Sequence, residues 1–331
     1  MTLSLSSSLR AWALSALLAL GASAAQAAGP DKVTVAGWSQ PITEITNLLV
    51  EEDKGFFKAR GIELGYVSGA GGGDAIRNML TGQATVAFTD PGSFFAALDK
   101  GEKLRGIYDI YPQNVFNVVS LKTSNITRPA DLKGKKIGVY SLSSGTRQNL
   151  LVLLQQAGLT EADVTIVVTG LLNFAPLMQG QVDATAATDT GLLVGRQKGL
   201  GEVNVIEVRE HLNVSSDLFV VTEETYQTKK DVLKRFLAAY RDSMVWMIAN
   251  PDEAAALAVK RAIDGRNLAI NREVIRLRNL SSVSATTQAR GLGAIDMATF
   301  QKAADSYKKL GMIQRDIKVA DVLAQDLLPP K

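Results

Sequence analysis

The chain contains no cysteine and only one histidine, His211, among its 331 residues. Without cysteine it forms neither disulfide bonds nor thiolate metal sites, and it carries no lipid-anchored cysteine behind an export signal. A single histidine also excludes paired imidazole ligands and the H-E-x-x-H motif of metalloproteases. We therefore expect no metal site and no cofactor, and we expect His211 to be a surface or hinge residue.

Motifs of nucleophilic catalysis and phosphate binding are missing as well. The stretch SLSSGT at 141–146 lacks the G-x-S-x-G context of a hydrolase. The glycine-rich stretch GAGGGD at 69–74 has no Lys-Ser/Thr behind it, so it is not a P-loop. Because acid–base residues are scarce, we predict that the protein is not an enzyme. An exported enzyme acting on a small metabolite is the alternative.

The chain also has little net charge and no long apolar run beyond its first segment. The formal net charge is +3, and lysine and arginine are scattered, so we expect no nucleic-acid partner. Residues 1–27 hold a single charge, Arg10, followed by the apolar stretch AWALSALLALGASA and by AQA. This order is typical of a secretory signal peptide cut after Ala27, with a retained membrane anchor as the alternative. We expect a periplasmic protein without stable membrane insertion.

The remaining sequence alternates between strand-like and helix-like segments. Strand-like residues at 32–39, 62–69 and 84–90 are separated by segments with helical periodicity, including an amphipathic helix predicted over 41–61. This βαβ rhythm predicts a mostly parallel sheet covered by helices. The rhythm begins again at 133–141.

The second series repeats landmarks of the first. Trp38 corresponds to Tyr140, and the Thr-Asp pair ending at Asp90 corresponds to the pair ending at Asp189. Two series with the same order of landmarks predict an α/β protein with two similar Rossmann-like lobes.

The path of the chain between the lobes is also predicted. The β-rich segments 114–122 and 213–224 bracket the second series, and the pattern is helical after them. We assign residues 28–113 and 215–331 to lobe I and residues 114–214 to lobe II. Two crossover strands then form a hinge, and hinge bending closes the lobes on a ligand.

Candidate ligand-binding residues stand at the carboxyl ends of the predicted strands, where ligands bind in parallel α/β sheets. In lobe I and the hinge they are Trp38, Ser39, Gln40, Ser68, Gly69, Asp90 and Asn114. In lobe II they are Ser141, Ser143, Ser144, Gly145, Thr146, Asn173 and Asp189.

Several of these candidates have a purely structural alternative. Ser143 and Ser144 precede a helix, so their hydroxyls and amides suit an anion, or one of them only caps the helix. Asp90, which precedes a proline, either contacts ligand or caps a helix, and Asp189 has the same two alternatives. Trp38 either stacks on ligand or packs in the core.

Four longer motifs resemble one known family. They are EEDKGFFKARGIEL at 51–64, MLTGQATVAFTDPGSFFAALDKG at 79–101, ITRPADLKGKKIGVYSLSSGT at 126–146 and LLQQAGLTEADVTIV at 153–167. Together they resemble the periplasmic substrate-binding proteins of ABC importers, in the branch that binds nitrate, taurine, alkanesulfonates and thiamine-pyrimidine precursors.

The resemblance implies a type II periplasmic binding protein fold, in which two α/β lobes clamp a small-molecule ligand. It also implies delivery of the ligand to an ABC permease and its ATPase, and we expect a monomer. The binding role carries over to Trp38, Ser39, Ser68, Gly69 and Asp90 and to residues 143–146. Fungal pyrimidine synthases of the same superfamily have a histidine and cysteine cluster that is missing here.

The residues leave the identity of the ligand open. A sulfonate or a similar anion suits the serine-rich helix start, whereas a heteroaromatic amine suits stacking on Trp38 with a hydrogen bond to Asp90. We therefore predict a periplasmic solute receptor for a small organic nitrogen or sulfur compound that is sulfonate-, taurine- or pyrimidine-like.

Overall fold

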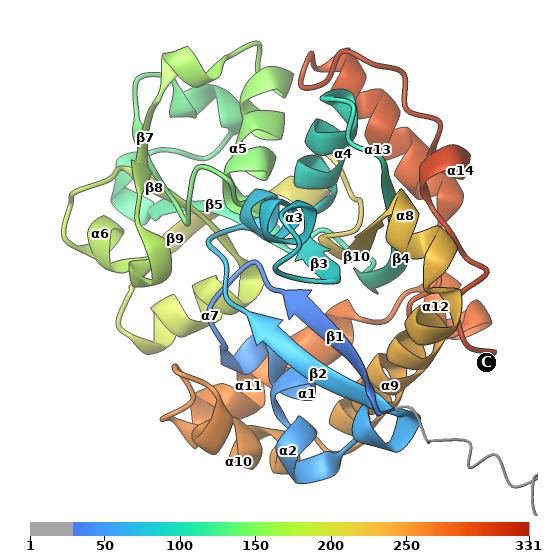
Figure 1. The fold of residues 1–331 in the computed structure, drawn as a ribbon. Helices are drawn as coiled ribbons and strands as arrows, with labels where there is room; N and C mark the ends of the chain where they lie inside the picture. The colour runs from blue at the N-terminus through green and yellow to red at the C-terminus, as the bar shows by residue number, and fades with distance from the viewer. Residues whose placement is uncertain (1–28, 331) are drawn as a thin grey trace, which may run out of the picture. The chain divides into compact units, whose positions relative to one another are not determined.

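The computed structural model describes residues 29–330, and the predicted signal peptide at 1–27 lies outside the described residues. The residues from Asp31 onward form one compact unit, whose ribbon is shown in Figure 1. Within this part of the chain we find no helix with the length and hydropathy needed to cross a bilayer.

Two five-stranded sheets organise this unit. The first has the order β2-β1-β3-β10-β4 and consists of β1 (Asp31–Ala36), β2 (Ile62–Val67), β3 (Val86–Thr89), β4 (Leu104–Tyr111) and β10 (Asp217–Thr222). The second has the order β7-β6-β8-β5-β9 and consists of β5 (Phe116–Leu121), β6 (Lys136–Val139), β7 (Thr165–Val168), β8 (Ala184–Thr188) and β9 (Val203–Glu207). We call the part built on the first sheet lobe I and the part built on the second sheet lobe II.

Each sheet contains one strand that runs against the others. In the first sheet β10 is antiparallel to both β3 and β4, and in the second β5 is antiparallel to both β8 and β9. The remaining pairings are parallel. The reversed strand is the one that has just arrived from the other lobe. It enters its sheet at the edge where its neighbours end, so it must run opposite to them. The predicted pair of lobes with mostly parallel sheets is confirmed.

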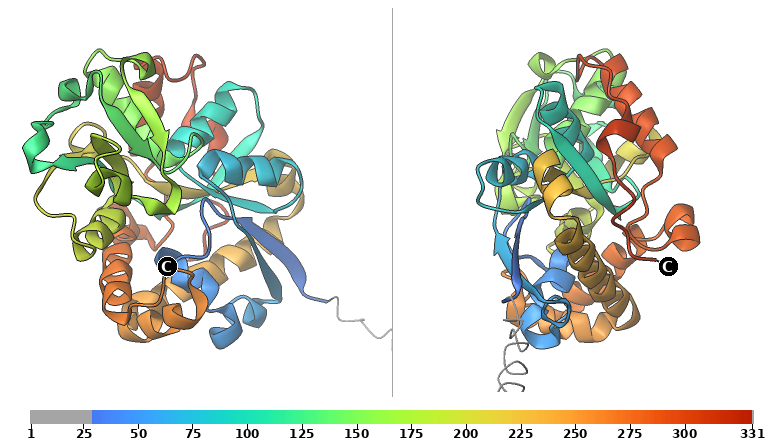
Figure 2. Two further views of the ribbon diagram at one scale, coloured as in Figure 1. Left: turned by 90° about the vertical axis from the view of Figure 1, so that its left-hand side faces the viewer. Right: turned by 45° about the vertical axis from the view of Figure 1, so that its right-hand side comes forward.

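The helices connect these strands and extend the chain beyond β10. Those between strands are α1 (Thr46–Leu49), α2 (Glu51–Lys54), α3 (Gly72–Leu80), α4 (Pro91–Asp99), α5 (Gly145–Gln156), α6 (Ala175–Met178) and α7 (Asp189–Gln197). Those after β10 are α8 (Glu223–Thr228), α9 (Lys230–Ala249), α10 (Pro251–Arg261), α11 (Leu268–Ser281), α12 (Ala285–Arg290), α13 (Met297–Lys309) and α14 (Val319–Val322). In Figure 2, α10 and α11 lie beside α1 at one end of lobe I.

The single amphipathic helix predicted over 41–61 is wrong. The chain instead forms a 3-10 turn at Thr43–Ile45, the two short helices α1 and α2, and a second 3-10 turn at Lys58–Arg60. Gly55 ends α2 in the left-handed region at φ 67°, where its N–H donates to the carbonyl of Glu51. A glycine adopts this conformation without steric cost, so the helix stops although the apolar spacing continues.

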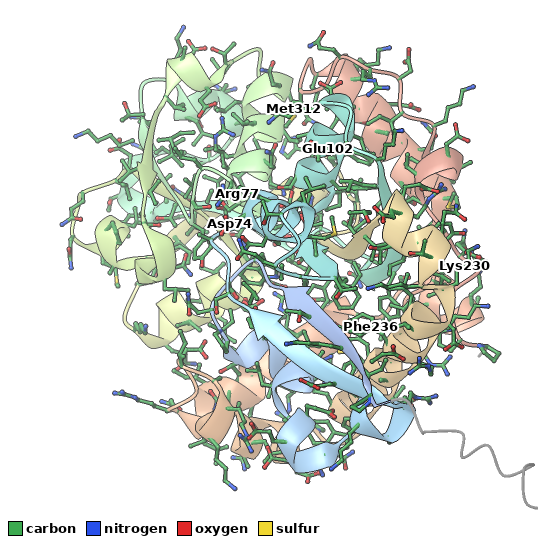
Figure 3. All side chains as sticks on the ribbon, in the orientation of Figure 1. Asp74, Arg77, Glu102, Lys230, Phe236 and Met312 are labelled. Atoms are coloured by element: carbon green, nitrogen blue, oxygen red, sulfur yellow. The ribbon has the colours of Figure 1, made fainter. Side chains whose placement is uncertain are left out.

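The 20-residue helix α9 ties the C-terminal helices to lobe I. Its buried Phe236 packs against Phe219 of β10 with 5.3 Å between ring centroids, and Tyr240 lies 4.7 Å from the same ring. Figure 3 marks Phe236 on this helix. Burying an aromatic side chain of this size contributes about 1.5–3 kcal/mol, so these contacts hold α9 on the first sheet.

Two connections between the lobes run side by side. The N–H of Ser216 donates to the carbonyl of Tyr111 at 2.8 Å, and the N–H of Val115 donates to the hydroxyl of Ser216 at 2.9 Å. The lobe boundaries expected at 113/114 and 214/215 fall in these connections, between β4 and β5 and between β9 and β10. Those boundaries stay a prediction.

Candidate functional site

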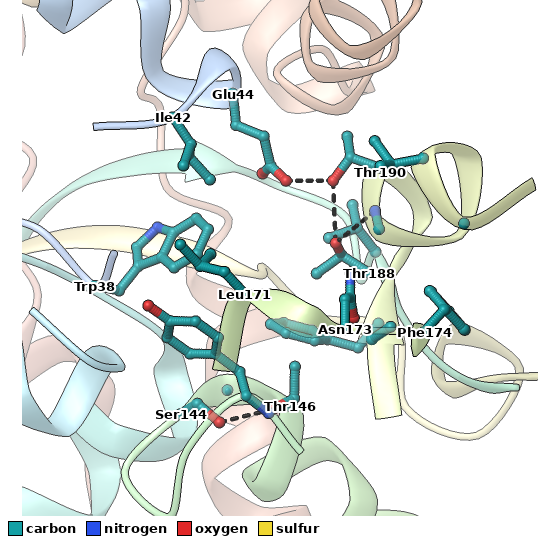
Figure 4. Close-up of a pocket in the computed structure, with 18 of the residues that line it drawn as sticks. Trp38, Ile42, Glu44, Ser144, Thr146, Leu171, Asn173, Phe174, Thr188 and Thr190 are labelled. Atoms are coloured by element: carbon teal, nitrogen blue, oxygen red, sulfur yellow. Dashed lines mark hydrogen bonds between the residues drawn. The ribbon is translucent and has the colours of Figure 1, made fainter. Parts of the chain in front are cut away.

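A cavity of about 310 Å³ lies where the carboxyl ends of strands from both lobes face one another. Figure 4 shows Trp38 and Ile42 of lobe I together with Leu171 and Phe174 of lobe II around this space. Its aromatic walls are Trp38, Phe116, Tyr140 and Phe174. Its charged lining residues are Glu44, Asp90, Lys198, Asp217, Asp264 and Arg278. Cavities of this size with apolar walls and a few polar groups are typical of small-molecule sites.

Trp38 forms a wall of the cavity two residues after β1. Its half-buried ring meets Phe88 edge-on at 6.4 Å and Tyr140 edge-on at 6.3 Å, so it joins the lobe I core to the first turn of lobe II. The indole Nε1 is buried and has no hydrogen-bond partner among the described residues. Trp38 therefore packs against the core and also forms an aromatic wall of the cavity.

Asp90 is both a helix cap and a lining residue. Its Oδ1 accepts from the N–H of Ser93 at 2.9 Å and its Oδ2 accepts from the Ser93 hydroxyl at 2.7 Å, at the start of α4. The side chain is 2% exposed and lines the cavity. Burial raises the pKa of Asp90, against the opposing effect of the two bonds from Ser93. The two alternatives stated for this residue are thus compatible.

Asp217 lines the cavity beside Asp90 and was not predicted from the sequence. Leu218 of β10 pairs with Thr89 of β3, so Asp217 and Asp90 are the next residues along the two strands, beside a bulge between Asp217 and Leu218. Asp217 is 7% exposed, and its carboxylate accepts no hydrogen bond from the described residues. The sequence feature that could have identified Asp217 is an acid at the start of the otherwise apolar segment DLFVV.

The start of α5 brings three predicted residues, Ser144, Gly145 and Thr146, to the cavity. Ser144 caps the helix, because its hydroxyl accepts from the N–H of Arg147 at 3.5 Å. A side chain on Gly145 would meet the Cβ of Asp90 at 3.2 Å, so lobe II approaches lobe I closely here. Arg147 turns away from the cavity and pairs with Glu161.

Ser141 and Ser143 connect the two lobes and do not line the cavity. Both hydroxyls donate to the carbonyl of Ala70, the Ser143 bond measuring 2.9 Å. The N–H of Gly73 in turn donates to the carbonyl of Ser143 at 2.9 Å. These hydroxyls, which the sequence suggested for binding an anion, are therefore hydrogen-bonded to the backbone of lobe I.

The other predicted lobe I and hinge residues surround the cavity without lining it. Ser39 and Gly69 are buried, Ser68 is half-buried and Gln40 is exposed. Asn114 donates to the Asn149 side chain at 2.9 Å and to the Leu212 carbonyl at 3.0 Å, and it accepts from the N–H of Phe116. Asn114 thus has its amide engaged in the connection between the lobes.

Two further predicted residues belong to lobe II. Asn173 lines the cavity and adopts a left-handed φ of 51°. Asp189 does not cap α7, since the hydroxyl of Thr188 accepts from the N–H of Gly191 at 3.3 Å. The Asp189 carboxylate instead accepts from the guanidinium of Arg278 in lobe I.

Arg278 and Glu44 complete a polar cluster that the sequence did not reveal. The Nε of Arg278 lies 3.4 Å from Glu44, and its guanidinium stands over the Tyr111 ring at 5.2 Å from the centroid. Glu44 accepts from the hydroxyl of Thr190, as the dashed line in Figure 4 shows. Because Arg278 is 1% exposed and faces both Glu44 and Asp189, its charge is already balanced within the protein.

His211 lies at the surface, as expected, where its Nδ1 is 2.9 Å from the side-chain oxygen of Gln156. Within residues 29–330 we find no group of His, Asp or Glu side chains arranged to hold a metal ion.

The two-lobe α/β architecture is that of periplasmic binding proteins. The structure superimposes on the alkanesulfonate-binding protein SsuA from Xanthomonas axonopodis pv. citri bound to MOPS with a TM-score of 0.71, at 16% sequence identity. The alignment covers 90% of this chain and 100% of that chain. At this level of identity the similarity shows the fold alone.

The sequence matches the family described as NMT1/THI5 like over residues 42–254, and the chain belongs to that family. It is 24% identical over 306 residues to the riboflavin-binding protein RibY of Chloroflexus aurantiacus, covering 90% of this chain and 86% of the relative. It is 23% identical over 216 residues to the formylaminopyrimidine-binding protein of Halalkalibacterium halodurans, covering 63% and 64%. The family predicted from the sequence motifs is confirmed.

Proposed function

We propose that the protein is the periplasmic solute receptor of an ABC importer, and that it binds a small heteroaromatic nitrogen compound between its lobes. The observation that carries this proposal is the composition of the cavity. Aromatic rings from both lobes line it, and the buried Asp217 faces it without a partner among the described residues. A flat ring with N–H groups suits such a site, by stacking and by hydrogen bonds to carboxyl oxygens.

A sulfonate or another anion suits this cavity less well. The buried guanidinium of Arg278 already pairs with Glu44 and Asp189, and Lys198 is exposed. The other buried ionisable residues of the lining, Asp90 and Asp217 among them, are acids and offer a negative group no cationic partner between the aromatic walls. An anion would therefore lose water without gaining a free buried cation.

The relatives support the receptor role and the ligand class. Two of them are named for binding riboflavin and a formylaminopyrimidine, and both ligands contain nitrogen heterocycles with N–H groups. Contacts between the lobes at Ser143 and at Arg278 fit a protein that closes around its ligand. Export by the predicted signal peptide and delivery to a permease and its ATPase belong to the same proposal.

A thermal-shift screen followed by calorimetric titration tests the proposal. Riboflavin and 4-aminopyrimidine should raise the melting temperature, because a ligand that binds only the folded state stabilises it by linkage. MOPS and taurine should have little effect. If none of these compounds changes the melting curve, the receptor function fails. Chromatography of the same mixtures would reveal turnover, which is the result expected of the alternative enzyme.

The transport partner needs a separate measurement. The purified receptor, loaded with whichever compound binds, should stimulate ATP hydrolysis by its permease–ATPase complex in proteoliposomes. The ligand-free receptor should stimulate less, since closure of the lobes is the signal that the ligand provides. Equal ATP hydrolysis with and without receptor would contradict the importer role and leave ligand binding intact.

A further inference from the structure

Asp217 differs from the other acidic residues of the cavity in having no internal partner. Asp90 receives two hydrogen bonds from Ser93, and Asp264 accepts from the N–H of Thr43 at 2.8 Å. Glu44 accepts from Thr190. A carboxyl that is largely removed from bulk water and has no donor within the protein is costly, so such groups are rare unless something binds them.

The position of Asp217 directs its carboxyl toward the ligand space. It follows the connection from lobe II and begins β10, where it pairs with Tyr111 of β4 and lies one residue before Leu218, the partner of Thr89 in β3. Asp217 and Asp90 both line the cavity, so the two carboxyls form one acidic surface at its lobe I side.

The charged groups around Asp217 are mostly acidic. Asp90, Glu44 and Asp109 all act on it unfavourably, and together with burial they raise the pKa of Asp217 well above its usual value. The phenols that face it are Tyr111 and Tyr240. The nearest guanidinium described above, Arg278, is bonded to Glu44 and Asp189. A carboxyl in these surroundings is stabilised by a ligand that brings a hydrogen-bond donor or a positive charge.

We propose that Asp217 is the residue that selects the ligand, by pairing with a ring edge that carries an N–H donor next to an acceptor. This assignment rests on the proposed receptor function. An amino group beside a ring nitrogen, or an imide N–H beside a carbonyl, forms two parallel hydrogen bonds with a carboxyl group. The Trp38 ring supplies a stacking wall for the same ligand. The neighbouring Asp90 is also an acid, so this side of the cavity offers an anionic ligand no cationic partner.

Pairs of probes that differ in one donor test the assignment. 4-Aminopyrimidine and 4-methylpyrimidine have nearly the same shape, and only the first has the N–H group. 3-Methylriboflavin also lacks the N–H group of riboflavin, but its methyl group adds volume at that position. By calorimetry the wild-type protein should prefer the donor-bearing probe by roughly tenfold or more, since an unpaired buried polar group opposes binding of the other. The preference should fall to about twofold or less in Asp217→Leu.

Two variants separate recognition from folding. Asp217→Asn keeps one donor and one acceptor, so it should retain most of the preference that Asp217→Leu loses. Asp305→Leu makes the same change at an exposed acid outside the cavity and should behave like the wild-type protein. Ligand-free Asp217→Leu should melt no lower than the wild-type protein, because it removes a buried polar group that has no partner.

The outcomes distinguish the assignment from the proposed function. If the wild-type protein prefers the donor-bearing probes and Asp217→Leu keeps that preference, the assignment to Asp217 is wrong and the receptor function stands. If the wild-type protein binds MOPS or taurine more tightly than these probes, the carboxyl does not exclude anions and the assignment also fails. If no probe binds at all, the proposed function fails and the assignment fails with it.

Discussion

The guanidinium of Arg278 in α11 donates to the carboxylate of Asp189 in α7, and this ion pair joins lobe I to lobe II beside the cavity. A second link, from the hydroxyl of Ser143 to the carbonyl of Ala70, joins the lobes through the start of α5. Both contacts can form only while the two lobes are together. Each therefore stabilises a closed arrangement of the lobes relative to an open one.

Asp189→Asn should weaken ligand binding by destabilising the closed state. The Asp189 side chain is 30% exposed, so the charge is partly screened, and we expect a loss of about 1 kcal/mol, roughly fivefold in Kd. Calorimetric titration gives the affinity, and small-angle scattering of the ligand-free protein should show a larger radius for the variant. Affinity falls because the apparent Kd rises as the closed population falls.

Arg276→Gln is the matched control for this prediction. Arg276 lies on the same helix, but it is exposed and its partners Asp252 and Glu273 both belong to lobe I. This variant should leave affinity and scattering unchanged. An Asp189→Asn protein that binds as tightly as the wild type would show that the ion pair does not favour closure.

Local patterns in the sequence predicted much of the fold and part of the cavity wall. The strands were recognisable from β-branched alternation, and the turns after them supply Trp38, Asp90, Ser144, Thr146 and Asn173 to the lining. These residues are accessible to prediction because each lies within seven residues of the end of its own strand. Whether they contact ligand stays a prediction.

Asp217 and Arg278 could not be found in the same way. Asp217 reaches the cavity because β10 inserts between β3 and β4, and this insertion depends on long-range pairing. Arg278 reaches it because α11 packs against α7 of the other lobe. The hydroxyls of Ser141 and Ser143 donate to the Ala70 carbonyl of lobe I instead of lining the cavity. The sequence could not indicate this acceptor, because only the contact between the lobes brings it to the two serines.

Trp38→Ala should weaken binding of the heteroaromatic probe by about 1–3 kcal/mol, the usual cost of truncating a central aromatic contact. Trp38→Phe keeps an aromatic wall, so it should lose less affinity than Trp38→Ala. Calorimetric titration measures both losses.

Trp246→Phe is the control for the change from indole to phenyl. The Nε1 of Trp246 donates to Glu253 at 3.2 Å on α10, and Trp246 does not line the cavity. Its affinity should equal that of the wild type. If Trp38→Ala lowers the melting temperature and leaves affinity unchanged, Trp38 is a core residue and not a wall of the binding site.

Asp109 should make the stability of the protein depend on pH. It is buried in β4 next to the connection between the lobes, where the hydroxyl of Ser215 donates to it at 2.7 Å. Burial raises the pKa of Asp109 to about 7, with a further unfavourable effect of Asp296. The unfolded chain releases this proton near pH 3.8, its ordinary value, whereas the folded protein holds it until about pH 7.

The sign of the effect follows from proton linkage. Between these two pH values the folded state binds more protons than the unfolded state, so the free energy of unfolding falls as the pH rises, by at most about 1.4 kcal/mol per unit from this group. Asp109→Asn keeps an acceptor for Ser215 but does not titrate. Relative to the wild type it should therefore gain stability steadily from pH 4 to pH 7 and hold a constant advantage above pH 8.

Differential scanning calorimetry of the two proteins from pH 4 to pH 9 measures this difference directly. Subtracting one curve from the other removes the contributions of groups on which Asp109 does not act. Asp305→Asn, an exposed substitution of the same kind, should give a difference that is flat across the range. A flat difference for Asp109→Asn as well would mean that Asp109 has the same pKa in the folded and unfolded states, contrary to its burial.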